Sequence, residues 1–204
     1  DTSRFYVSLA TPGVIYRDLM IVGFRTGENL PAAPGDIRAF DVRTGELVWS
    51  FHTIPEAGEL GADTWPETAR ESLGGANAWA GFALDEEGGI VYAPTGSAAP
   101  DFFGGDRLGD ILFANSLLAL DAATGERIWH FQAIRHDIWD RDFPSPPSLV
   151  TVQRDGKTID AVAQPSKQGY LYLFDRTTGE PIFPMEEFAV PPSPIPEERA
   201  ATTQ

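Results

Sequence analysis

The chain has 204 residues, 42% hydrophobic and 22% charged, which bounds it to one or two domains with enough apolar residues for a packed core. Asp and Glu number 30 against 15 Lys and Arg, and the resulting net charge of -15 argues against nucleic acid as a partner, because no net positive field replaces the counterions on phosphates. The absence of Cys excludes a disulfide framework, a thiolate metal site and a Cys nucleophile, and no apolar run approaches the roughly 18 residues of a membrane span.

Short apolar runs separated by Gly, Asp and Pro predict strand pairs along the chain. In chain order the expected pairs are GVIY with LMIVGF, AGFAL with IVYAPTG, and LVTVQ with IDAVAQ. Each pair is followed by a copy of one repeated hairpin pattern, in the segments IRAFDVRTGELVWSF, LLALDAATGERIWHF and LYLFDRTTGEPIFPM. The sequence therefore predicts a repeated unit of four antiparallel strands.

The repeated hairpin carries the turn Asp-x-x-Thr-Gly, with glycines at Gly45, Gly125 and Gly179, 80 and 54 residues apart. The Asp supplies a side-chain acceptor where the turn begins, and the Gly can take a positive φ. An aromatic residue lies four positions past each Gly, and these aromatics are expected to pack in the core. They are Trp49, Trp129 and Phe183.

A four-stranded antiparallel unit of this kind is the blade of a β-propeller, so the fold class is all-β. Three blades are expected, at about 11–53, 79–133 and 148–185, which makes the chain a partial propeller. The tail 186–204, with its PPSPIP stretch, is expected to be a linker or an excursion.

In such a meander the first and third turns of each blade share one end of the sheet, and all of these turns are short. The longer segments all belong to the opposite end, which is therefore where binding and catalysis are expected. These segments are 25–36, 54–78, 97–113, 132–147 and 165–169.

The segment HFQAIRHDIWDRD places Asp137, Asp140 and Asp142 within six residues. Carboxylates this close repel one another, and a divalent cation or hydrogen bonds would relieve the repulsion. A solvated acidic surface is the alternative, but Trp139 among these charges favours a partly desolvated pocket. Loop 97–113 contains Arg107, either paired with a neighbouring Asp or part of a site.

The Asp-x-x-Thr-Gly-x-x-x-Trp repeat resembles the tryptophan-docking motif of the quinoprotein dehydrogenases, eight-bladed propellers that bind pyrroloquinoline quinone (PQQ). Three further segments also look like this family, namely NAWAGFALDEEGGIVYAPTGSAAPDFFGGDR, WHFQAIRHDIWDRDFP and QPSKQGYLYLFDRTTGEP. The resemblance covers nearly the whole chain. It is closer to the glucose-dehydrogenase-like branch than to the methanol dehydrogenases, because Lys167 stands where the latter have Arg.

The resemblance implies oxidation of an alcohol or sugar by hydride transfer to the quinone. Trp79 would stack beneath PQQ, Asp140 would be the catalytic base, and Lys167 would hydrogen-bond the quinone oxygens and stabilise negative charge on them. Arg107 is a further candidate for contact with PQQ. An external acceptor, a cytochrome or ubiquinone, would receive the electrons, and the protein would act in the periplasm or on a membrane surface facing it.

The family also implies a metal ion, Ca²⁺ or else Mg²⁺ or a lanthanide, acting as a Lewis acid. The candidate ligands are Glu28, Ser97, Asp140 and Asp142. Ser97 departs from the family pattern, since alcohol dehydrogenases of the family have Asn eighteen residues after the stacking Trp.

Three blades cannot close a ring, so further blades or other chains are expected to complete it. Two alternatives stay open at the level of sequence. One is a non-catalytic PQQ-like propeller that binds protein partners in the cell envelope, which would not need Trp79, Asp140 and Lys167 together. The other is a carbohydrate-active propeller enzyme with paired carboxylates, which would explain the acidic loop but not the Lys or the Trp.

Overall fold

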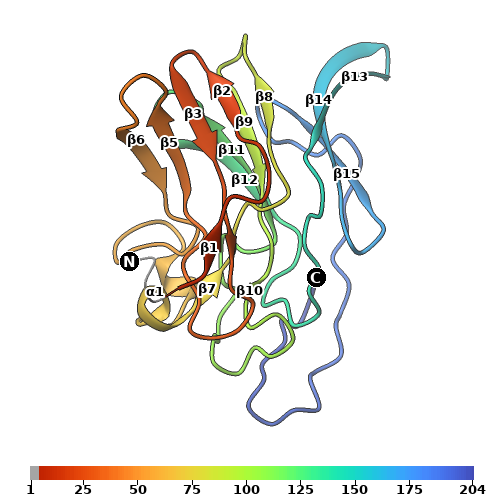
Figure 1. Cartoon of the computed structure of the whole chain (residues 1–204). Coiled ribbons are helices and arrows are strands. Elements are labelled where there is room, and N and C mark those ends of the chain that lie inside the picture. Colours follow the sequence, from red (N-terminus) through yellow and green to blue (C-terminus); the bar gives the residue numbers. More distant parts are fainter. Residues whose placement is uncertain (1–4) are drawn as a thin grey trace.

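Three antiparallel β-sheets lie side by side in the computed structural model, which describes residues 5–204 (Figure 1). The first sheet has the order β2 (Val14–Tyr16), β3 (Leu19–Val22), β5 (Ile37–Asp41), β6 (Leu47–Phe51). The second has the order β8 (Ala83–Asp85), β9 (Ile90–Pro94), β11 (Ser116–Asp121), β12 (Arg127–Gln132). The third contains β13 (Ser148–Arg154), β14 (Lys157–Pro165) and β15 (Leu171–Asp175). The expected all-β, partial-propeller architecture is confirmed.

Smaller elements lie among the connections. Two two-stranded pairs are β1 (Val7–Ser8) with β4 (Arg25–Thr26), and β7 (Gly74–Gly75) with β10 (Ala98–Ala99). The segment between the first two sheets also holds a short 3-10 turn (Ala62–Thr64) and the four-residue helix α1 (Ala69–Ser72). Within residues 5–204, no helix is long and apolar enough to cross a membrane.

The Asp-x-x-Thr-Gly turns form as their chemistry predicts. In the first, the Asp41 carboxylate accepts hydrogen bonds from the backbone N–H groups of Arg43 and Thr44, both at 2.8 Å. Gly45 then takes a φ of 74°, a left-handed conformation that costs a glycine little. The same pattern recurs where Asp121 and Asp175 begin the other two turns. The turn depends on local residues only, which is why the sequence predicted it.

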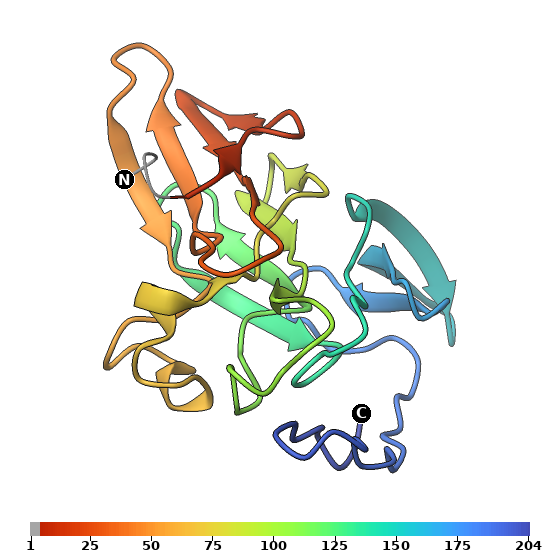
Figure 2. The same cartoon turned by 60° about the horizontal axis from the view of Figure 1, so that its bottom comes forward.

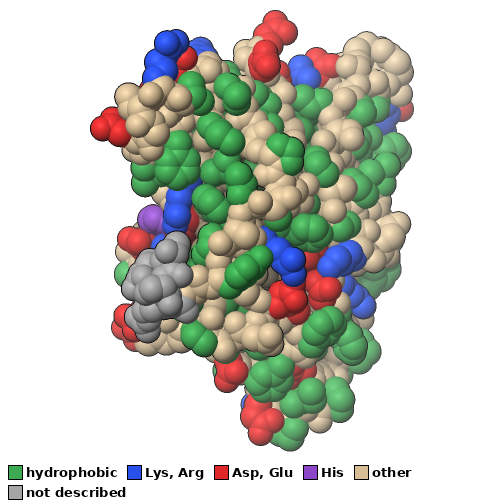
Figure 3. Space-filling view, viewed as in Figure 1, with side chains coloured by type: hydrophobic (Ala, Val, Ile, Leu, Met, Phe, Trp, Pro, Cys, Tyr) green, Lys and Arg blue, Asp and Glu red, His purple; other side chains and the backbone are tan. Residues whose placement is uncertain are grey.

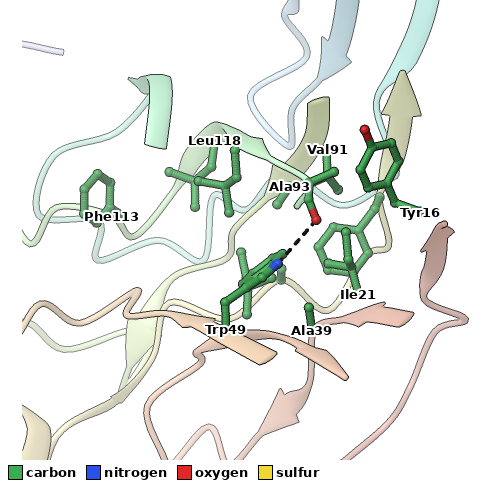
Figure 4. Packing of buried hydrophobic residues seen from close by; sticks show 13 residues of the cluster. Tyr16, Ile21, Ala39, Trp49, Val91, Ala93, Phe113 and Leu118 are labelled. Atoms are coloured by element: carbon green, nitrogen blue, oxygen red, sulfur yellow. Dashed lines mark hydrogen bonds between the residues drawn. The ribbon is translucent and has the colours of Figure 1, made fainter. Parts of the chain in front are cut away.

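Trp49 joins the first sheet to the second. Its indole is 8% exposed, and its Nε1 donates a hydrogen bond of 3.3 Å to the Ala122 carbonyl of the second sheet's turn. Figure 4 shows this indole among apolar side chains of both sheets, including Ile21 and Leu118. A Cβ at Gly125 would lie 2.5 Å from the Trp49 ring, so the indole rests directly on glycine backbone.

Trp129 repeats this arrangement between the second and third sheets. Its Nε1 donates to the Arg176 carbonyl at 3.1 Å, and a Cβ at Gly179 would lie 2.6 Å from its ring. Phe143 and Phe174 are buried in the same cluster. Each sheet is therefore held to the next by an aromatic side chain placed on the glycine of the following turn.

The third aromatic of the repeat does not follow this pattern. Phe183 is 58% exposed and lies against the Arg154 guanidinium, 4.4 Å from its ring centroid. The expected fourth strand is reduced to a bridge between Pro181 and Phe174. Prolines at 181 and 184 explain the difference, because a proline has no N–H to donate to a neighbouring strand. The prediction of core packing was wrong at Phe183.

The long connections gather at one end of the sheets. The short turns of the main strands lie at the top of Figure 1, whereas the long loops and the small strand pairs occupy the lower half. Seen from below, these loops crowd together in front of the sheets (Figure 2). Charged side chains of both signs also cluster on the lower half of this face (Figure 3). The predicted concentration of loops at one end is confirmed.

The tail after the third sheet belongs to the same end. It runs along the bottom of the molecule, where Ala189 pairs with Thr203 in an antiparallel bridge. Arg135 bonds both carboxylate oxygens of Glu187 at 2.8 Å. The buried Glu198 accepts a hydrogen bond of 2.9 Å from the backbone N–H of Gly104. The segment is thus docked on the loops.

Candidate functional site

A cavity of about 500 Å³ opens among the loops at this end of the sheets. Loops of all three sheets contribute to its wall, together with Ala10 and Thr11 near the start of the chain. Among the lining residues are six that the sequence singled out, namely Glu28, Trp79, Ser97, Asp140, Asp142 and Lys167. The structure therefore brings together side chains that lie up to 139 positions apart in the sequence.

Trp79 is held at the wall by polar contacts on its backbone and its ring. Its N–H donates to the Asn77 carbonyl at 3.1 Å, and the Asn77 side chain donates to the Phe24 carbonyl at 2.7 Å. The indole Nε1 donates to Asp142 Oδ2 at 3.1 Å. Gly96 leaves room for this contact, since a Cβ there would lie 2.9 Å from both the indole nitrogen and the Asp142 carboxylate. The half-buried indole is thus fixed in orientation.

Lys167 lies between two carboxylates beside this indole. Its ammonium donates to Asp140 Oδ1 at 2.8 Å and to Asp142 Oδ2 at 3.2 Å. The same nitrogen lies 6.0 Å from the centroid of the Trp79 ring. The loop between β14 and β15 supplies Lys167, and the loop between β12 and β13 supplies both carboxylates. The antiparallel order of the third sheet places these two loops together.

Sharing one ammonium between two carboxylates shifts the protonation of the cluster. Burial and the negative charge of Asp142 raise the pKa of Asp140, although the hydrogen bond from Lys167 acts against this. Burial alone would lower the pKa of Lys167, but the two carboxylates raise it overall. Lys167 is therefore cationic at neutral pH, and Asp140 is a stronger proton acceptor than an ordinary Asp.

Ser97 lies at the cavity wall with its hydroxyl turned toward the protein. Its Oγ donates to Asp137 Oδ2 at 2.5 Å and accepts from Asn115 Nδ2 at 3.0 Å, while its N–H donates to Asp142 Oδ1 at 2.5 Å. Both oxygens of Asp142 therefore have protein donors. Two of the four predicted metal ligands are already engaged in holding the loops.

The remaining two predicted ligands face cations. Glu28 pairs with Arg25 at 3.1 Å, and Asp140 pairs with Lys167. Within residues 5–204, no group of three or more His, Asp or Glu side chains is arranged to hold a metal ion. The donors of the described part of the chain thus do not make a complete metal site.

Arg107 lies outside the cavity wall. It is fully buried, and its guanidinium donates to the carbonyl oxygens of Pro100 and Asp137 at 2.9 and 2.5 Å. Burial lowers its pKa. Its contact with a cofactor, expected from the sequence, stays a prediction. Trp139 differs from expectation, since it is 62% exposed and does not line the cavity.

Some residues of the cavity wall were missed by reasoning from the sequence. Arg25, Asn77 and Asp101 line the cavity although none of the three was singled out from the sequence. The Asn-Ala-Trp spacing was the available signal for Asn77, because an Asn two residues before a rim Trp can tie it to a neighbouring loop. The sequence left open a hydrogen-bonded role for one of the three carboxylates of this segment, and the structure gives that role to the buried Asp137.

The cavity wall offers two features that a flat ligand such as PQQ could use. An oriented indole offers a stacking surface, and the ammonium of Lys167 lies beside it. The wall also carries Arg25, which pairs with Glu28, and four carboxylates in all, those of Glu28, Asp101, Asp140 and Asp142. The volume also lies within the range of about 300–1,000 Å³ that is usual for small-molecule sites.

Comparison with known proteins finds relatives that are named as quinoprotein or quinone-dependent dehydrogenases. Quinoprotein glucose dehydrogenase of Gluconobacter oxydans is 38% identical over 199 residues, covering 95% of this chain and 24% of that protein. Quinate/shikimate dehydrogenase (quinone) of Acinetobacter baylyi is 37% identical over 212 residues, covering 98% of this chain and 25% of that protein. The chain thus spans about a quarter of the length of these relatives.

Solved structures agree on the fold. Quinohemoprotein alcohol dehydrogenase ADHIIG of Pseudomonas putida matches with a TM-score of 0.75 at 30% identity, over 84% of this chain and 26% of that one. A europium-containing methanol dehydrogenase matches with a TM-score of 0.77 at 23% identity, over 87% of this chain and 33% of that one, which supports the fold alone.

The family comparison covers the whole chain. Residues 1–204 match the family described as "PQQ: Glucose/ethanol/alcohol dehydrogenase, beta-propeller domain". This match agrees with the sheets joined by tryptophans and with the cavity in which Trp79, Asp140 and Lys167 meet. The chain belongs to the PQQ β-propeller family of glucose, ethanol and alcohol dehydrogenases.

Proposed function

We propose that this chain provides part of the cofactor- and substrate-binding face of a PQQ-dependent dehydrogenase that oxidises a hydroxyl group of an alcohol or sugar. The observation that carries the proposal is the meeting of Trp79, Asp140 and Lys167 in one cavity. Three separate loops supply these side chains, and core packing of the sheets requires none of them. The scaffold alternative, a non-catalytic propeller that binds protein partners, accounts for the sheets but gives no reason for this combination of side chains.

Binding and orientation fall to Trp79 and Lys167. The indole would carry PQQ on its face, and its bond to Asp142 would keep that face in one plane. The ammonium of Lys167 would stabilise negative charge on the quinone oxygens. PQQ, when bound, supplies the quinone that can accept a hydride, that is two electrons with one proton, from the substrate carbon.

Proton transfer falls to Asp140. Its carboxylate lines the cavity, and its raised pKa makes it a better acceptor for the proton of a substrate hydroxyl than an unperturbed Asp. Lys167 donates to Asp140 Oδ1, which orients the carboxylate before substrate arrives. The proton would thus be held on Asp140, next to the ammonium.

The remaining groups of the reaction are proposed at the level of the family. A metal ion such as Ca²⁺ would need ligands beyond the donors of residues 5–204. An external acceptor, a cytochrome or ubiquinone, would reoxidise the cofactor on the periplasmic side.

The direct test is reconstitution of the complete protein that carries this chain. PQQ is titrated with Ca²⁺ present while tryptophan fluorescence is followed, and dye reduction is then measured with glucose, ethanol and glycerol. We expect saturable quenching that weakens in Trp79→Ala, and reduction of the dye by at least one substrate. Absence of both quenching and dye reduction would leave the scaffold alternative in place.

Asp140→Asn tests the assigned base. The amide keeps the shape but cannot take the proton, so turnover is expected to fall by about 10³-fold. PQQ binding, measured by the same quenching, is expected to change little. The exposed Asp106→Asn in the neighbouring loop is the matched control and should behave as wild type. Wild-type turnover in Asp140→Asn would remove this assignment.

A further inference from the structure

Asp137 is a carboxylate that the proposed reaction does not use. It is 1% exposed and does not line the cavity, although it lies three residues before Asp140. A buried carboxylate is costly unless hydrogen bonds and positive charge compensate it. The donors that compensate Asp137 therefore indicate what this side chain does.

Backbone donors reach Asp137 from the turn that follows it. The N–H of Trp139 donates to Oδ1 at 3.0 Å, and the N–H of Arg141 donates to Oδ2 at 2.6 Å. These two N–H groups belong to the residues on either side of Asp140. The carboxylate thus fixes the peptide units that flank the proposed base.

Side-chain donors reach the same carboxylate from the loop between β9 and β11. Ser97 Oγ donates to Oδ2 at 2.5 Å, and Asn115 Nδ2 donates to Oδ2 at 3.0 Å. Both donors are buried. Asp137 therefore ties the turn to the second sheet, since Asn115 directly precedes Ser116, where strand β11 begins.

The turn itself needs such support. Asp140 has a φ of 54°, a left-handed conformation that is uncommon for residues other than glycine. His136 has a φ of 49° just before the anchor, and its Nδ1 lies 2.8 Å from the Gly109 carbonyl. Arg107 holds the backbone on the other side by donating to the Asp137 carbonyl at 2.5 Å. Strained residues of this kind persist where their surroundings fix them.

We infer that Asp137 is a positioning residue whose buried carboxylate holds the turn that presents Asp140 to the cavity, an inference that rests on the proposed function. It touches neither substrate nor cofactor. Its effect passes through the backbone on both sides of Asp140, and Ser97 and Asn115 hold it from the second sheet. Ser97 stands at the position where alcohol dehydrogenases of the family have an Asn that was expected to bind metal. In this chain the Ser97 hydroxyl donates to Asp137 instead.

The test replaces Asp137 by an isosteric amide in the complete protein. In Asp137→Asn an NH₂ group must meet either the Trp139 N–H or the three donors at Oδ2, so at least one bond to the turn is lost. A displacement of Asp140 by about 1 Å is expected to lower kcat by about 100-fold. KM and the dissociation constant for PQQ should change by about 10-fold at most, less than kcat, because Trp79 and Lys167 do not contact Asp137 and both keep their bonds to Asp142.

A second measurement needs neither cofactor nor substrate. Hydrogen exchange of the Trp139 and Arg141 amides should accelerate by about 10-fold in Asp137→Asn, while the amides of β14 stay as in wild type. Asn115→Gly tolerates the left-handed φ of 48° at this position and removes one donor, so a smaller change in the same direction is expected. Asn115→Gly also provides the test if Asp137→Asn does not fold. Asp106→Asn is the control for both measurements.

The outcomes separate the two proposals. Wild-type kcat with unchanged amide exchange would overturn the role of Asp137. Loss of kcat together with PQQ binding and with faster exchange in β14 would also overturn it, because the residue would then support the fold in general. A wild-type protein that reduces no dye would refute the proposed function, whereas faster exchange confined to Trp139 and Arg141 would still show the anchor.

Discussion

At the scale of single residues, Asp101 shows how the cavity handles negative charge. Burial raises the pKa of this carboxyl to about 7, and the charges of Asp140, Asp142 and Glu28 add to the effect while Arg107 opposes it. The cavity therefore changes its charge near neutral pH. A carboxyl that is neutral below this pH can donate a hydrogen bond, and above it can only accept one.

The raised pKa of Asp101 makes stability depend on pH. From the ordinary value of 3.8 up to about 7, the folded protein keeps a proton that the unfolded chain has released. Stability contributed by this group therefore falls as the pH rises through that window. Asp101→Asn cannot ionise, so this variant should exceed wild type in stability at pH 8 by about 1 kcal/mol after allowing for solvent screening of a partly exposed group.

Urea unfolding of the two proteins at pH 4 and pH 8 measures this difference. Near pH 4 the two should have similar stability, because Asp101 is largely protonated in the folded state of wild type and only about half ionised when unfolded. Asp106→Asn, on the exposed part of the same loop, should show no such dependence on pH. Equal stability of Asp101→Asn and wild type at pH 8 would contradict the raised pKa.

At the scale of elements, the contact between an indole and a turn glycine joins neighbouring sheets. Gly125 has a φ of 76° and carries the Trp49 ring, and Gly156 has a similar φ of 74° with open space around it. The two glycines therefore share a backbone requirement but differ in packing. Comparison of the two separates these contributions.

We expect Gly125→Ala to be the more destabilising of the two substitutions. Both introduce a Cβ at positive φ, at a cost of about 1 kcal/mol. Only at Gly125 does the new methyl overlap the Trp49 ring, which should add about 1–3 kcal/mol as overpacking. Chemical denaturation of both variants gives the difference directly. Equal losses of stability in the two variants would mean that the Trp49 ring moves away from the new methyl group without a cost in free energy.

Local chemistry explains which elements could be predicted from the sequence. The turn that begins at Asp41 depends on residues within five positions, so its pattern sufficed. The prediction of a fourth strand in the third sheet was wrong, because it followed the similarity to the other two repeats and did not allow for Pro181 and Pro184. A proline without an N–H prevents regular strand pairing even where the aromatic residue of the repeat is present.

The candidate site was predictable only in part. Topology determined which loops share an end of the sheets, so the meeting of Trp79, Asp140 and Lys167 could be expected. The direction in which individual polar side chains point could not be predicted from topology. The Ser97 hydroxyl bonds Asp137 through a contact 40 positions apart, and Arg107 finds backbone carbonyls in the interior, neither of which leaves a trace in local spacing.

At the scale of the whole molecule, the tail 186–204 closes over the loops that build the cavity wall. Glu198 is 4% exposed and accepts hydrogen bonds from Gly104 N–H at 2.9 Å and from Ser193 Oγ at 2.5 Å. The first of these bonds fastens the tail to the loop that contains Gly104. The neighbouring Glu197 is exposed. These adjacent residues differ in burial but not in chemistry.

Glu198→Gln should loosen the tail. Removal of a charged acceptor from a buried hydrogen bond weakens docking by about 1–2 kcal/mol, or about 10-fold in the closed population. Trypsin should then cut after Arg199 faster by a similar factor, as followed by mass spectrometry. Glu197→Gln is the matched control and should be cut at the wild-type rate. Equal cutting of both variants would show that Glu198 does not fasten the tail.

The short hairpin ends of the sheets point away from the cavity, and this separation has a practical consequence. The turn between β13 and β14, which holds Asp155 and Gly156, lies at the top of Figure 1, at the opposite end from the long loops, and a Cβ at Gly156 would meet no atom within 4 Å. A surface tether or an electrode linker joined at that turn would leave the mouth of the cavity open to solution. Immobilised protein should therefore take up small molecules as freely as dissolved protein.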